Sequence, residues 1–248
     1  MKDSAAKTLM ITGAGKRFGK ALAEHYLALG WRIIAHYNSS NELEAELDPV
    51  QRAQCLFVQA DLSCENSVQG MIQQVKESGW SLDGIVHNAS GFEPDQKNAS
   101  DWQRSQRMMA IHVLAPQAIT TGLINHINAS GCIIAISDIY ADMPNQRFAG
   151  YCASKAGLQN LSLSLAQRLA PKVRVNVIQP GPVKFLPEHD QSYRDKVLSQ
   201  SLLKRELGYE PLIQACDYLL AADAVTGSVM RVDGGRFCAN RYEQHFIE

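Results

Sequence analysis

Short apolar runs rich in β-branched residues alternate with longer helical stretches along the chain, and this alternation constrains the fold more than any other feature. Strands that alternate with helices are joined by crossover connections, so the pattern predicts an α/β domain with a parallel sheet covered on both faces. Cys132-Ile-Ile-Ala-Ile136 is apolar throughout, as expected of a central strand. The expected strands are Thr8–Thr12, Arg32–Tyr37, Cys55–Gln59, Gly84–His87, Cys132–Ser137, Val173–Gln179 and Ser228–Val232. The expected helices lie near 17–29, 41–53, 65–78, 101–127, 150–170 and 209–222.

Composition limits the function classes. The chain has 248 residues, 46% of them hydrophobic, which suits one domain spanning 1–248. Its 24 basic and 25 acidic residues balance to a net charge of −1, so we expect no nucleic-acid partner. Six cysteines form no C-x-x-C pair, and we expect them to be small buried residues and expect no metal site. No apolar run approaches the ~20 residues of a membrane span, and the first residues lack an apolar signal core. We therefore expect a cytoplasmic protein without a membrane partner.

Two segments interrupt the alternation, Gly91–Ser100 after the fourth expected strand and Pro180–Ser201 after the sixth. Both follow the carboxyl end of a strand, where open α/β sheets bind their ligands. The alternative is that they are ordinary surface loops.

A glycine turn follows the first expected strand, Thr12-Gly-Ala-Gly-Lys-Arg-Phe-Gly19, and leads into a helix. Such a turn lets the backbone approach a pyrophosphate, while the helix N-terminus offers free N–H groups and a favourable dipole. The pattern is not the full G-x-G-x-x-G fingerprint. We interpret residues 8–90 as the nucleotide-binding part of the domain and residues 91–248 as the catalytic and substrate part.

The end of the second expected strand distinguishes the two nicotinamide cofactors. NAD-binding folds place an acid there, on the ribose 2′-hydroxyl. Here the stretch is His36-Tyr-Asn-Ser-Ser40, and the first acid is Glu42. Asn38, Ser39 and Ser40 can donate hydrogen bonds to a 2′-phosphate, and Lys16 can add charge. The sequence therefore favours NADPH, unless this loop is merely polar.

Tyr151 and Lys155 are four residues apart and share one face of an expected helix, and Asp138 lies thirteen positions upstream of the tyrosine. An ammonium beside a phenol favours the phenolate, so we expect Lys155 to lower the pKa of Tyr151. A phenol tuned in this way can pass a proton at neutral pH.

Six ordered motifs together make this chain resemble the short-chain dehydrogenase/reductase family over nearly its whole length. They are Thr12–Gly19, Asp61-Leu62, Asn88-Ala-Ser90, the Tyr151/Lys155 pair, Pro180-Gly181 and Val232-Asp-Gly-Gly235. The resemblance implies a single Rossmann-type, doubly wound parallel sheet of about seven strands with helices on both faces. It also implies an NADPH-dependent oxidoreductase and a homotetramer with the helices at 101–127 and 150–170 at its interfaces.

Two departures narrow the resemblance. Most family members carry glycine in place of Arg17 and serine in place of Asp138, and the combination seen here is similar to the pteridine reductase branch. Asn88-Ala-Ser-Gly-Phe92 is similar to that branch too, and Phe185–Lys204 is similar to bacterial dihydromonapterin reductases. The implied reaction is reduction of a 7,8-dihydropterin, with dihydrofolate as a slow substrate.

The resemblance implies the following roles. The catalytic residues would be Asp138, Tyr151 and Lys155. The substrate-binding residues would be Arg17, Ser90, Phe92 and Tyr151. The cofactor would be held by Gly13, Lys16, Arg17, Phe18, Tyr37, Asn38, Ser39, Asp61, Leu62, Asn88, Ala89, Lys155, Pro180, Gly181 and Val183.

Alternatives stay open for four of these side chains. Asp138 either supplies a proton or braces the loop 138–146. Arg17 either binds an anion at the helix start or is solvated. Phe92 either stacks on the substrate or folds onto the protein body. His112 stands where many short-chain reductases carry a relay asparagine, and it either continues that relay or is simply buried.

At the level of the whole protein, the rival functions are a ketone reductase, such as one acting on 3-oxoacyl thioesters, and a non-catalytic NADP sensor. Asp138 in place of serine argues against the first, and the intact Tyr151/Lys155 pair argues against the second.

Overall fold

The structure is a computed structural model that describes residues 6–95 and 102–239. Seven parallel strands form one sheet in the order β3-β2-β1-β4-β5-β6-β7, which confirms the predicted fold class. The strands are β1 Thr8–Ile11, β2 Arg32–Tyr37, β3 Cys55–Gln59, β4 Leu82–His87, β5 Ile127–Ile136, β6 Val173–Pro180 and β7 Val229–Val232.

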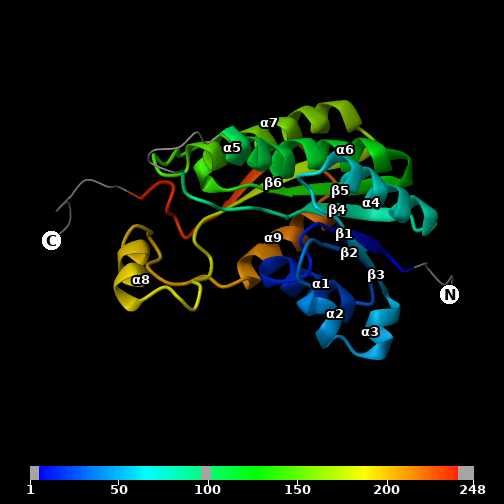
Figure 1. Cartoon of the computed structure of the whole chain (residues 1–248), viewed down its shortest axis with the longest axis horizontal. Coiled ribbons are helices and arrows are strands. Elements are labelled where there is room, and N and C mark those ends of the chain that lie inside the picture. The colour runs from blue at the N-terminus through cyan, green and yellow to red at the C-terminus, as the bar shows by residue number, and fades with distance from the viewer. Residues whose placement is uncertain (1–5, 96–101, 240–248) are drawn as a thin grey trace.

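Helices cover both faces of the sheet (Figure 1). The helices of the first half are α1 Arg17–Ala28, α2 Glu42–Glu46, α3 Pro49–Ala53 and α4 Glu65–Glu77. Those of the second half are α5 Trp102–Met109, α6 Ala115–Leu123, α7 Ala149–Leu169, α8 Gln191–Leu198 and α9 Glu210–Ala221. Among the described residues, every helix is too short or too polar to span a bilayer.

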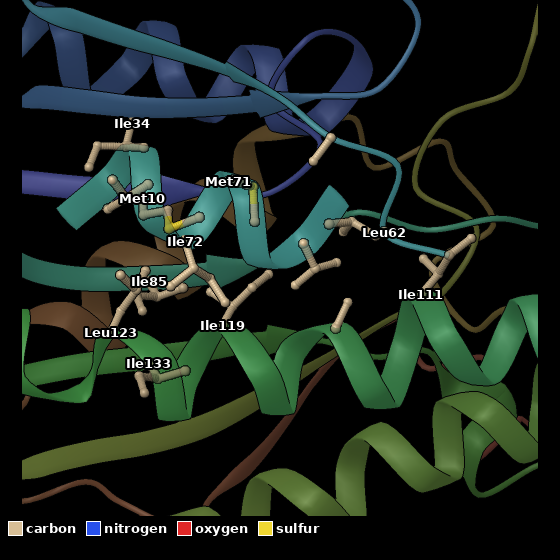
Figure 2. Close-up of a cluster of buried hydrophobic side chains, with 14 of the residues drawn as sticks. Met10, Ile34, Leu62, Met71, Ile72, Ile85, Ile111, Ile119, Leu123 and Ile133 are labelled. Atoms are coloured by element: carbon tan, nitrogen blue, oxygen red, sulfur yellow. The ribbon is translucent and has the colours of Figure 1, made fainter. Parts of the chain in front are cut away.

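The core has one layer on each face of the sheet, because successive strand residues point to opposite sides. Met10, Ile85 and Ile133 pack with side chains of α4, α6 and α7, and Figure 2 shows part of this cluster. The neighbouring residues Leu9 and Ile134 pack on the other face, against α1 and α9. This double burial explains why the central strands read as continuous apolar runs.

Two expected helices are divided. The helix expected at 41–53 becomes α2 and α3, because Asp48 caps a new helix and Pro49 occupies its first turn. The helix expected from 101 to 127 begins at Trp102 in the described part, since residue 101 lies outside it. It then passes through a π-helical turn at Ala110–Leu114 and ends in the short 3₁₀ turn Ile124–His126.

Two further elements differ from the expectation. β5 begins five residues earlier than predicted, because Ile127 pairs with Leu82 of β4 across an irregularity in the register. The segment Pro180–Ser201 contains α8, whose first turn is capped by Asp190. Of the other expected loop, Gly91–Ser100, residues 96–100 lie outside the described part of the chain.

Candidate active site

The glycine turn between β1 and α1 leaves no room for side chains. A Cβ on Gly15 would stand 2.2 Å from the carbonyl oxygen of Ser40, and one on Gly19 would stand 2.1 Å from that of Gly13. Lys16, the residue before α1, is extended, and within the described residues no side chain caps this helix. Its first N–H groups are therefore available to an anion, which fits the pyrophosphate site that the sequence predicts.

Arg17, the first residue of α1, holds a backbone conformation that favours glycine. Its φ is +54°, in the left-handed region, which costs an ordinary residue about 1–2 kcal/mol. Most members of the family that the sequence resembles carry glycine here. A strained arginine at the entrance to a helix is a candidate functional side chain.

A buried histidine and an asparagine brace the turn. The Gly13 N–H donates to His36 Nδ1 at 3.0 Å, and His36 Nε2 lies 3.0 Å from the Ala60 carbonyl oxygen. Burial lowers the pKa of His36, so the ring is neutral and can make both bonds. Asn88 Nδ2 donates to the carbonyl oxygens of Thr12 and Gly13 at 3.1 and 3.2 Å. Sequence reasoning assigned Asn88 to the cofactor but did not single out His36.

A cavity of about 690 Å³ opens at this carboxyl end of the sheet. Lys16, Arg17, Arg107 and Lys184 contribute positive charge to its lining, and Asp138 is the one acidic side chain there among the described residues. This charge balance fits a ligand that carries several phosphates. The predicted site residues that line the cavity are Gly13, Lys16, Arg17, Phe18, Tyr37, Asn38, Ser39, Asn88, Ala89, Ser90, Phe92, Asp138, Tyr151 and Val183.

Five predicted cofactor residues lie outside that lining: Asp61, Leu62, Pro180 and Gly181, and also Lys155, whose contacts are described below. Asp61 accepts hydrogen bonds from the N–H and hydroxyl of Ser63, and these bonds lower the pKa of its carboxyl. Leu62 is buried in the core cluster of Figure 2. Pro180 ends β6, and the Gly181 N–H donates to the carbonyl oxygen of Val232. Their contacts with a cofactor stay predictions.

Tyr151 and Asp138 form the polar centre of the cavity. The Tyr151 hydroxyl donates to Asp138 Oδ2 at 2.8 Å, while the Tyr140 N–H donates to Asp138 Oδ1, also at 2.8 Å. The aspartate therefore both braces its loop and contacts the tyrosine, so the two interpretations of this residue are compatible. Burial raises the pKa of the Asp138 carboxyl, as the sequence predicts for a proton-supplying acid.

The predicted direction of the shift in the Tyr151 pKa is wrong: the sequence predicted a lowered pKa, and the structure gives a raised one. Burial is the largest cause, and together with the charge of Asp138 it raises the pKa of the phenol well above its usual range. Lys155 lies with Nζ 5.7 Å from the centre of the Tyr151 ring and donates to the Ile136 carbonyl oxygen at 2.9 Å. Burial lowers the pKa of Lys155 to about 8. Tyr151 is thus a neutral hydrogen-bond donor.

Phe92 faces the tyrosine. Its ring stacks on Phe148 with centroids 4.5 Å apart and meets Tyr151 edge to face at 4.8 Å. It nevertheless stays 56% exposed and lines the cavity. The side chain therefore presents one apolar face to a ligand while it folds onto the protein body.

His112 sits in the π-helical turn, buried beneath the cavity floor. Its Nε2 lies 2.9 Å from Ser90 Oγ, and its Nδ1 lies 2.7 Å from Ser154 Oγ. Burial lowers the pKa of the imidazole well below its usual value, so the ring is neutral.

One wall of the cavity comes mostly from the segment Pro180–Ser201 that the sequence marked as a ligand-binding place, although its individual side chains were not predicted. It is formed by Lys184, Leu186, His189, Tyr193 and Tyr209. The rings of His189 and Tyr193 are tilted against each other at the start of α8 with centroids 4.5 Å apart, and those of Phe18 and Tyr209 lie with centroids 5.9 Å apart. The available signal was the helix cap Asp190, which stands between His189 and Tyr193.

Known proteins match this chain closely in fold and sequence. A family model described as Enoyl-(Acyl carrier protein) reductase matches residues 13–236. Dihydromonapterin reductase from Enterobacter sp. is 36% identical over 240 residues, which cover 95% of this chain and 99% of that protein. The Escherichia coli enzyme of the same name is 34% identical over 92% of this chain and 95% of its own length.

Solved structures with a similar fold point to the same family as these relatives. FolM alternative dihydrofolate reductase 1 from Brucella canis, in complex with NADP, superimposes with a TM-score of 0.86 at 27% identity, covering 98% of both chains. The Brucella suis protein, also with NADP, gives a TM-score of 0.85 at 27% identity and the same coverage. Together with the seven-stranded sheet, these matches show that the chain belongs to the short-chain dehydrogenase/reductase family of NAD(P)-dependent oxidoreductases.

Proposed function

We propose that this protein uses NADPH to reduce the C=N bond of a 7,8-dihydropterin, giving the tetrahydropterin. The observation that carries the proposal is the 2.8 Å hydrogen bond from Tyr151 to a buried aspartate, Asp138, in the cavity beside the α1 N-terminus. The names of the dihydromonapterin reductase relatives support the same substrate class.

The cofactor would lie along the glycine turn. The uncapped N-terminus of α1 and Lys16 would bind its pyrophosphate, and Asn38 and Ser39 would donate to the 2′-phosphate. The neighbouring wall, Tyr37–Ser40, contains no carboxylate to repel that phosphate. NADPH supplies the hydride in this reaction.

Asp138 and Tyr151 would manage the proton. When hydride adds to the carbon of a C=N bond, negative charge develops at the nitrogen, and one proton must be added there. The pKa values of Asp138 and Tyr151 are both raised. Each group therefore holds its proton to a higher pH than an exposed aspartate or tyrosine does. When Asp138 takes up a proton, this carboxyl and the phenol hydrogen-bonded to it form a pair that can deliver the proton, directly or through water.

Two other functions have some support. The matching family model is described as Enoyl-(Acyl carrier protein) reductase, and this description favours an acyl thioester substrate. The FolM neighbours favour dihydrofolate. Among thioesters, Asp138 argues against a 3-oxoacyl substrate, because the ketone oxygen is better served by the neutral serine hydroxyl that most family members carry.

A substrate panel tests the proposal. Purified protein is mixed with NADPH and, separately, with dihydromonapterin, dihydrobiopterin, dihydrofolate or a 3-oxoacyl thioester, and the loss of NADPH absorbance is followed. We expect fastest turnover with a dihydropterin. Turnover restricted to the thioester would refute the proposal, and no turnover with any substrate would favour a sensor.

We predict a preference of about 10²-fold or more for NADPH over NADH in kcat/KM, because the 2′-phosphate gains two or three charge-assisted bonds. The matched variant is Asn38→Asp, which adds a carboxylate to the same wall without changing side-chain size. It should lower the preference at least about tenfold. Equal kcat/KM for the two cofactors in the unsubstituted protein would contradict the assignment.

We predict that Phe92→Ala raises the dihydropterin KM about tenfold or more and leaves the NADPH KM nearly unchanged. The variant removes the apolar face beside Tyr151, and an aromatic pair contributes ~0.5–1.5 kcal/mol beyond its buried area. Phe92→Trp, which keeps a flat face, is the control and should be tolerated. An unaltered pterin KM in Phe92→Ala would remove this residue from the binding site.

The family resemblance also leads us to propose a homotetramer with the helices at 101–127, which include α5 and α6, and α7 at its interfaces. Trp102 of α5 and Leu114 of the π-helical turn are exposed apolar side chains, which supports burial against another copy. Light scattering on the purified protein measures this directly, and a monomeric mass at micromolar concentration would exclude it.

A further inference from the structure

A chain of hydrogen bonds leads from the cavity into the protein interior through His112. Ser90, at the exposed end, lines the cavity, and its Oγ lies 2.9 Å from His112 Nε2. On the other side of the ring, Ser154 Oγ lies 2.7 Å from His112 Nδ1 and also donates to the Tyr151 carbonyl oxygen at 2.7 Å. Ser154 and His112 are almost fully buried.

Counting hydrogens along this chain assigns the tautomer of His112. A serine hydroxyl carries one hydrogen, and that of Ser154 is used toward the backbone of its own helix. Ser154 Oγ must then accept from His112, so Nδ1 carries the ring hydrogen and Nε2 carries a lone pair. In the opposite tautomer Ser154 would have to donate to Nδ1, so its 2.7 Å bond to the Tyr151 carbonyl oxygen would be lost. The Ser90 hydrogen would then have the 3.3 Å bond to the Gly91 carbonyl oxygen in place of the 2.9 Å bond to His112.

At its inner end, this chain of hydrogen bonds does not lead to solvent. It ends at the backbone carbonyl of Tyr151, inside α7, where a side-chain relay has no further acceptor among the residues described. The imidazole also stays neutral, because burial lowers its pKa. His112 is therefore placed to orient Ser90 rather than to conduct protons from water.

We propose that His112, fixed by Ser154 with its hydrogen on Nδ1, draws the Ser90 hydroxyl hydrogen away from the cavity, so that Ser90 offers only lone pairs to the substrate. A substrate that presents a ring N–H or an amino group is then accepted, and one that presents a carbonyl oxygen at this point is rejected. The proposal rests on the proposed function and names a positioning residue that sets substrate specificity at the same site.

Ser154→Ala tests the proposal without altering the cavity lining. The variant removes the acceptor of the Nδ1 hydrogen, so the ring should change to the Nε2-protonated form, donate to Ser90, and turn the serine hydrogen toward the cavity. Alanine suits a helix interior, so the fold should survive. Ser162→Ala is the matched control, since Ser162 is another buried serine of α7, and its hydroxyl donates to the Leu158 carbonyl oxygen two turns further on.

Two readouts are needed. Nitrogen-15 NMR of histidine-labelled protein, recorded without substrate, reports which ring nitrogen of His112 is protonated, and the loss of one signal set in His112→Phe identifies the resonances. Steady-state kinetics report KM and kcat. We expect an Nδ1-protonated ring in the unsubstituted protein and in Ser162→Ala, and a shift toward Nε2 in Ser154→Ala. The dihydropterin KM of Ser154→Ala should rise about threefold to tenfold, the loss of one hydrogen bond, with kcat and the NADPH KM within about twofold.

An Nε2-protonated His112 in the unsubstituted protein overturns the proposal. So does an unchanged tautomer in Ser154→Ala, or a changed tautomer with an unaltered dihydropterin KM. Absence of dihydropterin turnover by the unsubstituted protein refutes the proposed function instead, and the substrate-free spectra still decide the tautomer.

Discussion

Replacing Tyr151 with phenylalanine should lower kcat for dihydropterin reduction by about 10²–10⁴, while NADPH binding survives. The ring packs edge to face against Phe92 and His112, and phenylalanine keeps these contacts. What is lost is the hydroxyl that donates to Asp138 Oδ2. The measurement is kcat under saturating substrate, together with a fluorescence titration of NADPH.

Tyr140→Phe is the matched control for this variant. Tyr140 lies two residues after Asp138, and its hydroxyl accepts a hydrogen bond from Asn145 without lining the cavity. Its loss should leave kcat within about twofold. Near-normal turnover by Tyr151→Phe would show that the proton comes from Asp138 or a water chain without the phenol.

The fold followed from local patterns wherever strand and helix periods were unambiguous. Apolar runs such as Ile133–Ile136 predicted central strands, because both faces of the sheet are buried. The start of β5 could not be predicted in the same way. Asn128, Ser130 and Gly131 are polar or small, and the early start depends on two pairings that the sequence does not show, Ile127 with Leu82 of β4 and Gly131 with Val173 of β6.

The two divided helices show a different limit of prediction from the sequence. Asp48-Pro49 carried a helix-start signal inside the range expected to be one helix, and a stricter use of capping rules would have separated α2 from α3. The π-helical turn around His112, between α5 and α6, has no comparable sequence signal.

At the candidate site, the sequence predicted where the residues lie better than it predicted their pKa values. The carboxyl ends of parallel strands meet at one edge, so residues following β1, β2, β4 and β5 were expected to gather there, and they do line one cavity. The spacing of Tyr151 and Lys155 placed both on one helix face, but it gave neither their burial nor the distance to Asp138. Those two quantities raise the pKa of the phenol and reverse the expected sign.

The cofactor residues expected at Asp61 and Leu62 illustrate the same point. Both follow a strand end, as the pattern required, yet Leu62 turns into the core and the Asp61 carboxylate caps its own turn through Ser63. Position at the sheet edge was predictable, whereas side-chain direction depended on which neighbours each residue could reach.

Asp138→Asn should lower kcat for dihydropterin reduction by about 10² or more, because it removes the carboxyl proton while preserving the shape of the site. The amide oxygen of asparagine can still accept the Tyr140 N–H that fixes the loop, so thermal stability should change little. Asp48→Asn, at a capping aspartate of α3 remote from the cavity lining, is the control for the chemical change itself.

The pH dependence of kcat distinguishes an Asp138 that supplies a proton from an Asp138 that only braces its loop. Burial raises the pKa of Asp138, so the protonated carboxyl persists to higher pH than in an exposed aspartate, and it is lost as the pH rises through that raised value. If Asp138 supplies or relays the proton, kcat of the unsubstituted enzyme falls over this range, and Asp138→Asn loses that limb of the profile. Asp138→Ser should be equally slow with dihydropterin, since a serine hydroxyl is too weak an acid to replace a carboxyl. A folded Asp138→Asn variant with unchanged kcat and pH profile would restrict Asp138 to bracing the loop that begins at β5.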